Sequence, residues 1–304
     1  LALLSSQASA DDACRPRDAD RPAIGLVLGG GGARGSAHVG VIRRLEELRI
    51  PVDCIVGTSM GSLVGAMYAT GMNADELDTL LAEVDWARIF DDSTPREDQP
   101  FRRKRDDQFA LFGPKVGIGK DSSVLSTGAV SGQRISFLFE SLVSERTRQS
   151  SFRDLPIPFR AVAADIVTGE RVLMDDGNLA SAMRASMSVP GAFDPVRRDG
   201  RLLVDGGIVD NLPVQAAREM GADIVIAVDV GGNGAREEDI TNVVAVLGQL
   251  FNLMVSTNAR ASRESLTARD VWINPPLPRD FGPARFDRSA EGVGIGYEAA
   301  LAQS

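Results

Sequence analysis

Two stretches near the start of the chain share one order: a short apolar segment, a glycine-rich turn, then a segment with helical periodicity. The first apolar segment is Ile24–Leu28, and the second ends at Gly57. A short apolar run that is bounded by glycine and followed at once by a helix is typical of a strand buried in a parallel sheet. A chain that begins with two such units is expected to fold as an α/β protein.

The same alternation continues through the second half and predicts a layered α/β sheet with helices on both faces. We predict strands at 159–167, 171–177, 201–207, 222–230 and 270–278, and helices at 73–89, 178–187, 213–220 and 242–255. Residues 91–132 lack this periodicity and are too long for an ordinary connection, so they form a candidate lid or binding loop. No internal repeat or linker marks a boundary, which predicts one domain over 11–304 with its core at about 23–304.

The charge balance argues against one broad class of function. The 304 residues include 33 basic and 42 acidic side chains, a formal charge of -9. A nucleic-acid binder needs clustered Lys and Arg in excess to neutralise phosphates. We therefore expect no nucleic-acid partner, and the 43% hydrophobic and 25% charged content is that of an ordinary globular protein.

The first ten residues, LALLSSQASA, have the pattern of the end of a signal peptide. An apolar stretch precedes the small-residue site Ala8-Ser9-Ala10, which predicts a signal-peptide remnant over 1–10, a mature start at Asp11 and export. No later run reaches the roughly 18 apolar residues that a membrane-spanning helix needs. Contact with lipid is therefore expected at the membrane surface.

The chain has two cysteines, Cys14 and Cys54, and a single histidine, His38. This set lacks the Cys/His clustering of a zinc site, so no metal is expected. Export would permit a disulfide between the two cysteines. Cys54 lies in the apolar run VDCIVG, however, which favours a buried free thiol and leaves the bridge as the alternative.

The pentapeptide Gly57-Thr58-Ser59-Met60-Gly61 has the form G-x-S-x-G and joins a predicted strand to a predicted helix. In this context the pattern predicts a nucleophile elbow, a tight turn that exposes the serine hydroxyl at a helix N-terminus. Gly57 and Gly61 suit the turn because a Cβ at either position would collide with neighbouring backbone. Ser59 is therefore the candidate nucleophile.

A nucleophilic serine needs a general base, and two residues are candidates. His38 lies about one turn into the first predicted helix, where a histidine more commonly packs or caps, so we do not expect it to be catalytic. Asp205 ends an apolar strand and precedes Gly206 and Gly207, which leaves its carboxylate little steric cover. Partial burial would raise its pKa from about 3.9 and make it a stronger base. We predict Asp205 as the base, with a turn aspartate that caps its own loop as the alternative.

The run Gly29-Gly30-Gly31-Gly32-Ala33-Arg34-Gly35 follows the first predicted strand and opens a helix. Its backbone amides suit either a phosphate or an oxyanion. The spacing matches G-x-G-x-x-G, but a dinucleotide site needs an acidic residue at the end of the second strand, where GTSMG stands instead. We expect amides around Gly30 to Gly32 to face Ser59 as an oxyanion hole, with Arg34 adding charge or orienting the loop.

Taken in order, GGGARG, GTSMG and DGG, each at a predicted strand end, resemble the motifs of the patatin-like phospholipase family. The resemblance extends through RGSAHVGVIRRLEEL, ASMSVPGAFDPV and LLVDGGIVDNLPV and covers about 23–304. It implies a three-layer α/β/α fold, in which a central, mostly parallel sheet carries the nucleophile elbow, and a Ser-Asp dyad of Ser59 and Asp205. It also implies an oxyanion loop and supporting glycines, namely Gly30, Gly31, Gly32 and Arg34, with Gly31 and Gly32 favoured as donors, and Gly35, Gly57, Gly61, Gly206 and Gly207.

By the same resemblance, the chain is a lipid acyl hydrolase of the phospholipase A type that needs neither a metal nor an organic cofactor. Exported bacterial members of the family imply a protein that is secreted or associated with the outer membrane or surface of a bacterium. A lysophospholipase or general lipid esterase is the alternative within the same chemistry. A non-catalytic lipid-binding module on the same fold is the alternative outside it.

Two further segments are candidates for contact with a membrane or a partner. Arg102, Arg103, Lys104 and Arg105 form a basic run beside aromatic and aliphatic residues, which predicts docking on anionic lipids; a solvated loop is the alternative. The predicted helix 242–255 is the most apolar in the chain, and we expect it to belong to the core. A homodimer face and a wall of the acyl-binding site are the alternatives for this helix.

Overall fold

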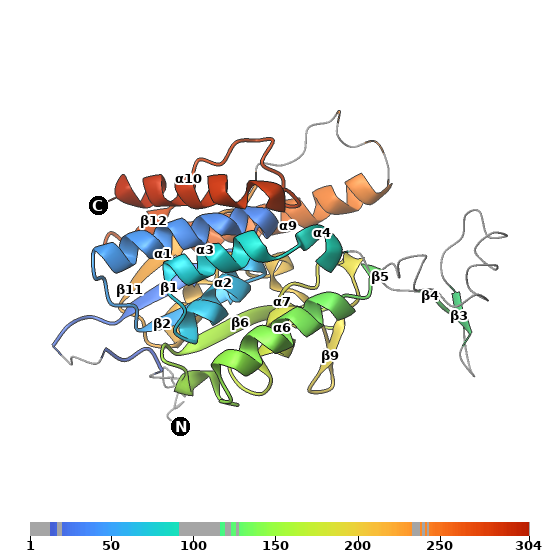
Figure 1. The fold of residues 1–304 in the computed structure, drawn as a ribbon, viewed down its shortest axis with the longest axis horizontal. Coiled ribbons are helices and arrows are strands. Elements are labelled where there is room, and N and C mark those ends of the chain that lie inside the picture. Colours follow the sequence, from blue (N-terminus) through green and yellow to red (C-terminus); the bar gives the residue numbers. More distant parts are fainter. Residues whose placement is uncertain are drawn as a thin grey trace, which may run out of the picture.

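An eight-stranded mixed sheet lies at the centre of the described structure (Figure 1). The structure is a computed structural model that describes residues 13–16, 20–90, 116–118, 123–125, 128–232, 238, 241 and 243–303. The strands, in order across the sheet, are β12 (Val271–Ile273), β11 (Ile224–Val228), β1 (Ile24–Leu28), β2 (Cys54–Thr58), β6 (Phe159–Asp165), β10 (Arg201–Asp205) and β9 (Val196–Arg198), with β7 (Arg171–Met174) paired to β6.

The five strands from β12 to β6 run parallel, whereas β7, β9 and β10 pair in antiparallel fashion. Every residue of β2 and β6 is buried, and in β1 only Ile24 is partly exposed. Burial on both faces explains why these strands are continuous apolar runs in the sequence rather than alternating ones. The predicted, mostly parallel α/β sheet is confirmed.

Helices cover both faces of this sheet. They are α1 (Ala37–Glu47), α2 (Met60–Ala69), α3 (Ala74–Glu83), α4 (Trp86–Ile89), α6 (Gln133–Arg146), α7 (Leu179–Ser186), α8 (Val214–Glu219), α9 (Val243–Glu264) and α10 (Ser289–Leu301). Leu26 and Leu28 of β1 belong to the core that includes α1, α2 and α7, whereas Val27 belongs to the core that includes α8. Successive side chains of a strand point to opposite faces, so the sheet separates two helical layers, as the three-layer prediction requires.

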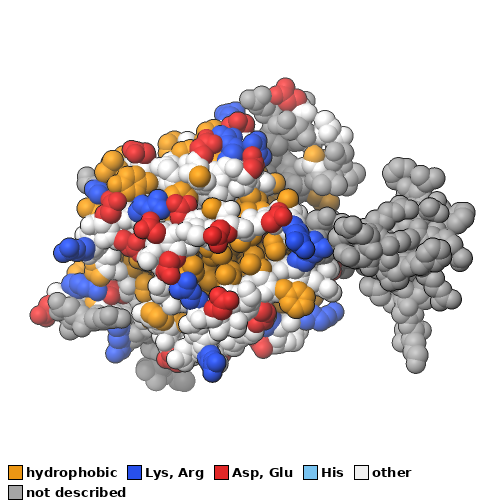
Figure 2. Space-filling view, viewed as in Figure 1, with side chains coloured by type: hydrophobic (Ala, Val, Ile, Leu, Met, Phe, Trp, Pro, Cys, Tyr) orange, Lys and Arg blue, Asp and Glu red, His pale blue; other side chains and the backbone are white. Residues whose placement is uncertain are grey.

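Helices α1 and α10 lie side by side, with α3 next to α1 (Figure 1). Their close approach depends on glycine, because a Cβ at Gly40 would overlap the Val293 carbonyl and one at Gly296 would overlap the Ala37 carbonyl. On the face in Figure 2, acidic and basic side chains are interspersed rather than gathered by sign. Arg43 of α1 and Asp78 of α3 form a partly buried ion pair at 2.8 Å. Ion pairs at a protein surface add at most about 1 kcal/mol each.

Shorter elements complete the described structure. They are the strand pairs β3 (Val116–Ile118) with β4 (Ser123–Leu125) and β5 (Gly128–Val130) with β8 (Gly191–Phe193), and the 3-10 helices η1 (Gly32–Ser36), η3 (Phe152–Asp154), η4 (Gly206–Ile208) and η6 (Phe286–Arg288). The helix predicted at 73–89 is divided into α3 and α4, because the Asp85 carboxylate accepts a hydrogen bond from the Arg88 amide at 3.1 Å and caps a new helix. Helix α9 continues nine residues beyond its predicted end at Val255, to Glu264.

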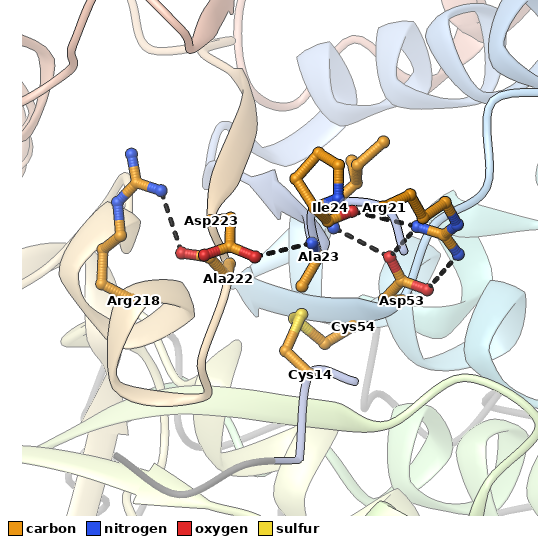
Figure 3. Close-up of a disulfide and its surroundings, with 10 residues drawn as sticks. Cys14, Arg21, Ala23, Ile24, Asp53, Cys54, Arg218, Ala222 and Asp223 are labelled. Atoms are coloured by element: carbon orange, nitrogen blue, oxygen red, sulfur yellow. Dashed lines mark hydrogen bonds and ion pairs between the residues drawn. A yellow bond between two sulfur atoms is a disulfide. The ribbon is translucent and has the colours of Figure 1, made fainter. Parts of the chain in front are cut away.

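Cys14 and Cys54 form a disulfide (Figure 3). The favoured prediction, a buried free thiol at Cys54, is therefore wrong. The amide of Cys14 donates to the Met220 carbonyl at 2.8 Å, which holds the N-terminal segment beside β2 and brings the two Cα atoms to 4.9 Å. The sequence around Cys54 could not reveal this, because the contact that places Cys14 comes from the end of α8.

Breaking the disulfide is expected to lower the free energy of unfolding by about 4 kcal/mol, because the bridge closes a long loop and restricts the unfolded chain. The cysteines are 40 residues apart in sequence. Urea unfolding of the parent, with and without reductant, measures the difference. The Cys14→Ser variant is the control, and its midpoint should not respond to reductant. Equal midpoints for the oxidised and reduced parent would contradict the expectation.

Candidate active site

Ser59 occupies the sharp turn between β2 and α2, as expected for a nucleophile elbow. Its φ of 53° and ψ of -123° lie in a region that non-glycine residues rarely adopt. A Cβ at Gly57 would overlap the Gly61 carbonyl, and one at Gly61 would overlap the Leu28 carbonyl. The turn therefore needs glycine on both sides, and Ser59 lines a cavity at the end of the sheet.

A second serine, which the sequence analysis did not single out, supports the turn. The Ser186 hydroxyl accepts a hydrogen bond from the Ser59 amide at 2.9 Å and donates one to the Val162 carbonyl at 2.6 Å. Ser186 is fully buried at the end of α7. It thus ties the strained elbow to β6. Ser186 lies in the stretch ASMSVPGAFDPV, which resembles family sequences but gives no local sign of this contact.

The strand register brings the predicted base to the nucleophile. β7 covers one edge of β6, so β2 and β10 share the other edge. β2 runs parallel to β6 and ends with Thr58 opposite Val162, whereas β10 runs antiparallel and ends with Asp205 opposite Ala163. The two strands meet end to end, and Ser59 and Asp205 come together at the junction.

Asp205 is 1% exposed, and its carboxylate is only partly satisfied. Oδ1 accepts from the Gly207 amide at 2.7 Å, whereas Oδ2 has no hydrogen-bond partner among the described residues. Burial raises the pKa of Asp205 to about 6, and the Ser59 hydroxyl and the Gly207 amide oppose this rise. The hydroxyl is thus near enough to favour the charged carboxylate without a fully formed bond to Oδ2, as is common in catalytic pairs before substrate binds. Such an aspartate is a stronger base and is still ionised at neutral pH.

The rate of ester hydrolysis is expected to follow the titration of Asp205. Only the charged carboxylate can accept a proton, so kcat/KM should rise about tenfold per pH unit below about pH 6 and level off above it. A pH–rate profile with a soluble, non-ionisable ester measures this. A profile that stays flat through pH 6 would contradict the role of Asp205 as base.

Asn211 holds the glycine loop by hydrogen bonds to Gly30, and two other amides of the loop stay unpaired among the described residues. The Gly30 amide donates to the Asn211 carbonyl at 3.2 Å, and the Asn211 side-chain amide donates to the Gly30 carbonyl at 3.2 Å. Gly31 and Gly32 have no hydrogen-bond partner for their amides within the described ranges, and both line the cavity beside Ser59. The arrangement therefore favours Gly31 and Gly32, rather than Gly30, as oxyanion donors.

Arg34 is 9% exposed and lines the same cavity. Its Nε donates to the Phe281 carbonyl at 2.7 Å, and its guanidinium lies against Gly232. Burial lowers the pKa of Arg34. Arg34 makes no ion pair with a carboxylate in the part of the chain that the structure describes, so no acidic side chain there offsets its charge. Gly35, next along the loop, has no room for a Cβ because of the Met60 side chain.

His38 is buried behind the glycine loop. Its Nε2 lies 2.8 Å from the Gly29 carbonyl, while Nδ1 has no hydrogen-bond partner among the described residues. Burial lowers the pKa of His38 to about 4, so the ring is neutral at physiological pH and donates to Gly29. This contact supports the loop, and His38 does not line the cavity that Ser59 and Asp205 share.

The cavity has a volume of about 660 Å³ and is mostly apolar. Its apolar wall includes Phe90, Met187, Phe193, Phe251, Val255 and Phe286. The Phe90 ring packs against Phe193 and Phe286, with centroids 5.6 Å and 5.2 Å apart. Apolar walls around a few polar groups are the usual form of a site for a small apolar ligand, and an acyl chain fits this description.

Asn258 on α9 is a further supporting residue that the sequence analysis missed. Its Oδ1 accepts from the Asn211 amide at 2.7 Å, and its Nδ2 donates to the Gly207 carbonyl at 2.8 Å. Asn258 therefore links the loop after Asp205 to the residue that holds Gly30. An asparagine inside a helix gives no signal of such a role in sequence, because both contacts come from distant segments.

The predicted lipid-contact residues Arg102, Arg103, Lys104 and Arg105 lie outside the described residues, as does most of the candidate lid. Within the described ranges, no group of His, Cys, Asp and Glu side chains could hold a metal ion. None of the described helices is long and apolar enough to cross a membrane.

The profile of the patatin-like phospholipase family matches residues 26–218, which contain the glycine loop, the elbow and Asp205. The chain belongs to the patatin-like phospholipase family. Human patatin-like phospholipase domain-containing protein 6 is 35% identical over 210 residues, which are 68% of this chain and 13% of that protein. An uncharacterized NTE family protein of Mycobacterium bovis is 34% identical over 250 residues, which are 81% of this chain and 60% of that protein.

This patatin-like chain thus spans less than two thirds of the curated relatives named above. Among solved structures, VipD from Legionella pneumophila superposes with a TM-score of 0.50 at 17% sequence identity, over 91% of this chain and 66% of VipD. At this identity the likeness shows the patatin-like fold alone. The family membership supports a lipid hydrolase. The geometry around Ser59 indicates which side chains could act in such an enzyme.

Proposed function

We propose that the chain is a lipid acyl hydrolase of the phospholipase A type that works through a Ser59–Asp205 dyad. The observation that carries the proposal is the end-to-end meeting of β2 and β10, which places a buried carboxylate beside an elbow serine in an apolar cavity. The single histidine of the chain is engaged elsewhere, so Asp205 is the base that remains.

In the proposed first step, Asp205 takes the hydroxyl proton as Ser59 Oγ attacks the acyl carbonyl. The carbonyl oxygen becomes an oxyanion that the amides of Gly31 and Gly32 stabilise, with the positive charge of Arg34 nearby. The C–O bond to the glycerol oxygen then breaks, and the proton on Asp205 passes to that oxygen. Lysolipid leaves and the fatty acyl group remains on Ser59.

In the second step, a water molecule gives its proton to Asp205 and attacks the acyl carbonyl. The ester bond to Ser59 breaks, the fatty acid leaves, and the proton returns to the serine. The apolar wall around Phe193 and Phe251 would hold the acyl chain throughout both steps. No step requires a metal ion or an organic cofactor.

Export is the second part of the proposal, with the protein secreted or associated with the outer membrane or surface of a bacterium. The Cys14–Cys54 disulfide supports it, because such bonds persist mainly in oxidising compartments. Fractionation of the producing cells tests it. Recovery of the protein in the cytosol with both thiols free would contradict it.

The activity is tested by incubating the purified chain, and its Ser59→Ala variant, with vesicles of mixed phospholipids. Mass spectrometry follows the release of fatty acid and lysolipid. Release of both by the parent alone supports phospholipase A activity, and the lysolipid isomer identifies the acyl position. Activity only on lysophospholipid or simple esters favours the alternative lysophospholipase or lipid esterase. Vesicle binding without any release favours a non-catalytic lipid-binding module.

A further inference from the structure

Helix α9 has two faces with different surroundings. On its inner face, Val255 and Ala259 are buried, and α9 packs against η4, directly after Asp205. Gly248, Phe251 and Val255 line the cavity that contains Ser59. The helix is therefore part of the wall of the candidate active site, which was an alternative in the sequence analysis.

The outer face of α9 is an exposed apolar stripe. It consists of five large hydrophobic side chains, each 44–54% exposed: Val246, Leu247, Leu250, Leu253 and Met254. Their spacing of three or four positions puts them on one side of the helix. They are five of the eleven large hydrophobic side chains that are exposed in the described part of the chain. The prediction that this helix belongs to the core is thus wrong for its outer face, because no described element covers the stripe.

The charged side chains of α9 lie at its C-terminal end. Residues 243–259 contain no Asp, Glu, Lys or Arg, and the first charged side chains that follow are Arg260 and Arg263. The helix ends with Glu264, and Arg263 pairs with Asp229 at 3.7 Å. An uncharged apolar stripe suits the boundary between acyl chains and headgroups.

The inner face of α9 packs against the protein, so its outer face is the one that could meet a membrane. The 22 residues of α9 are about 33 Å long. No described helix reaches the apolar content that a membrane crossing needs. A helix with one apolar and one packed face lies in the interface plane, with the apolar side chains inserted among the acyl chains.

We propose that the outer face of α9 docks the protein on the surface of a phospholipid bilayer. The inference rests on the proposed function. Because α9 lines the cavity that would take a lipid substrate, a lipid bilayer is the surface expected to cover its outer face. With α9 in the interface, the part of the cavity wall that Phe251 forms would lie close to the membrane. An acyl chain could then pass along the helix to Ser59 without crossing water.

The test replaces Leu247, Leu250 and Leu253 together by Gln. These side chains are exposed and do not line the cavity, so the fold and the chemistry should persist. Exposed hydrophobic residues elsewhere provide the matched control, the double variant Leu48→Gln with Leu301→Gln. Co-sedimentation with vesicles of phosphatidylcholine and phosphatidylglycerol measures docking, and circular dichroism checks the fold.

We expect the α9 variant to partition into vesicles at least tenfold less than the parent, and the control variant to partition like the parent. Hydrolysis of a soluble short-chain ester should be unchanged in both variants. Unchanged vesicle binding by a folded α9 variant would overturn the proposal. A parent that sediments as a dimer, with an α9 variant that is monomeric and still binds vesicles, would overturn it in favour of a second copy on this face.

The outcomes also separate this proposal from the proposed function. A parent that binds vesicles through α9 but hydrolyses neither vesicle lipid nor soluble ester would refute the enzymatic function and leave docking supported. A parent that hydrolyses both substrates, and an α9 variant that does so equally well with unchanged binding, would refute docking alone. Leu250→Trp gives a direct readout, because docking should shift its fluorescence to the blue when vesicles are added.

Discussion

Replacing Ser59 by Ala is expected to lower kcat for ester hydrolysis by about 10⁴-fold or more, because loss of the nucleophile removes the covalent pathway altogether. The variant should fold normally, since Ala removes one hydroxyl and leaves the backbone contacts of the elbow in place. The Ser59 amide would still donate to Ser186. Single-turnover and steady-state assays with a soluble ester measure the loss.

Ser144→Ala is the matched control for Ser59→Ala. The Ser144 hydroxyl is exposed and donates to the Ser141 carbonyl of its own helix, so its loss should leave the rate unchanged. Trapping with a radiolabelled organophosphonate adds a second readout, because the label should attach to the parent and to Ser144→Ala only. Label on Ser59→Ala, or a rate within tenfold of the parent, would place the nucleophile elsewhere.

Replacing Asp205 by Asn is expected to have two opposite effects: an activity lower by roughly 10⁴-fold and a more stable fold above pH 6. Asparagine has nearly the same shape and keeps an oxygen that can accept from the Gly207 amide, but it cannot take the Ser59 proton. The loss of activity follows from the missing base. The gain in stability follows from the buried charge that the substitution removes.

The direction of the stability effect follows from the raised pKa of Asp205. The carboxylate has a pKa of about 6 in the folded protein against 3.8 as the ordinary value, so the folded state binds the proton more tightly than the unfolded state. The parent therefore loses stability as the pH rises from about 4 to about 6, by about 3 kcal/mol in total. Asp205→Asn should not show this loss.

Thermal unfolding of the parent and of Asp205→Asn, at about pH 4 and about pH 7.5, measures the effect. The difference in Tm should be small at the lower pH and should favour the variant at the higher pH. Asp194→Asn, at an aspartate that does not line the cavity, is the control for a general effect of charge. A parent that is as stable as the variant at both pH values would contradict a destabilising effect of the buried Asp205 charge.

Much of the local structure was predictable from the sequence. The first strand has the predicted bounds, Ile24–Leu28, because a short apolar run between proline and glycine leaves little freedom. The elbow at Ser59 was likewise visible, because G-x-S-x-G between a strand and a helix is a local pattern. A Cβ at Gly57 would collide with nearby Gly61, whereas one at Gly61 would collide with Leu28 on the neighbouring strand. The exposure of the outer face of α9 was not predictable, because an apolar helix has the same sequence whether protein, lipid or a partner covers it.

The residues that could do the chemistry were visible in the sequence: the serine in its elbow, the glycine loop, and an aspartate at the end of a strand. That Ser59 and Asp205 meet depends on the fold, because β2 and β10 share one edge of β6 in opposite directions. The Cys14–Cys54 bridge and the supporting contacts of Asn258 depend on the fold as well. The physical reason is range: turn geometry and periodicity depend on neighbours in sequence, whereas strand register depends on packing between segments far apart in the chain.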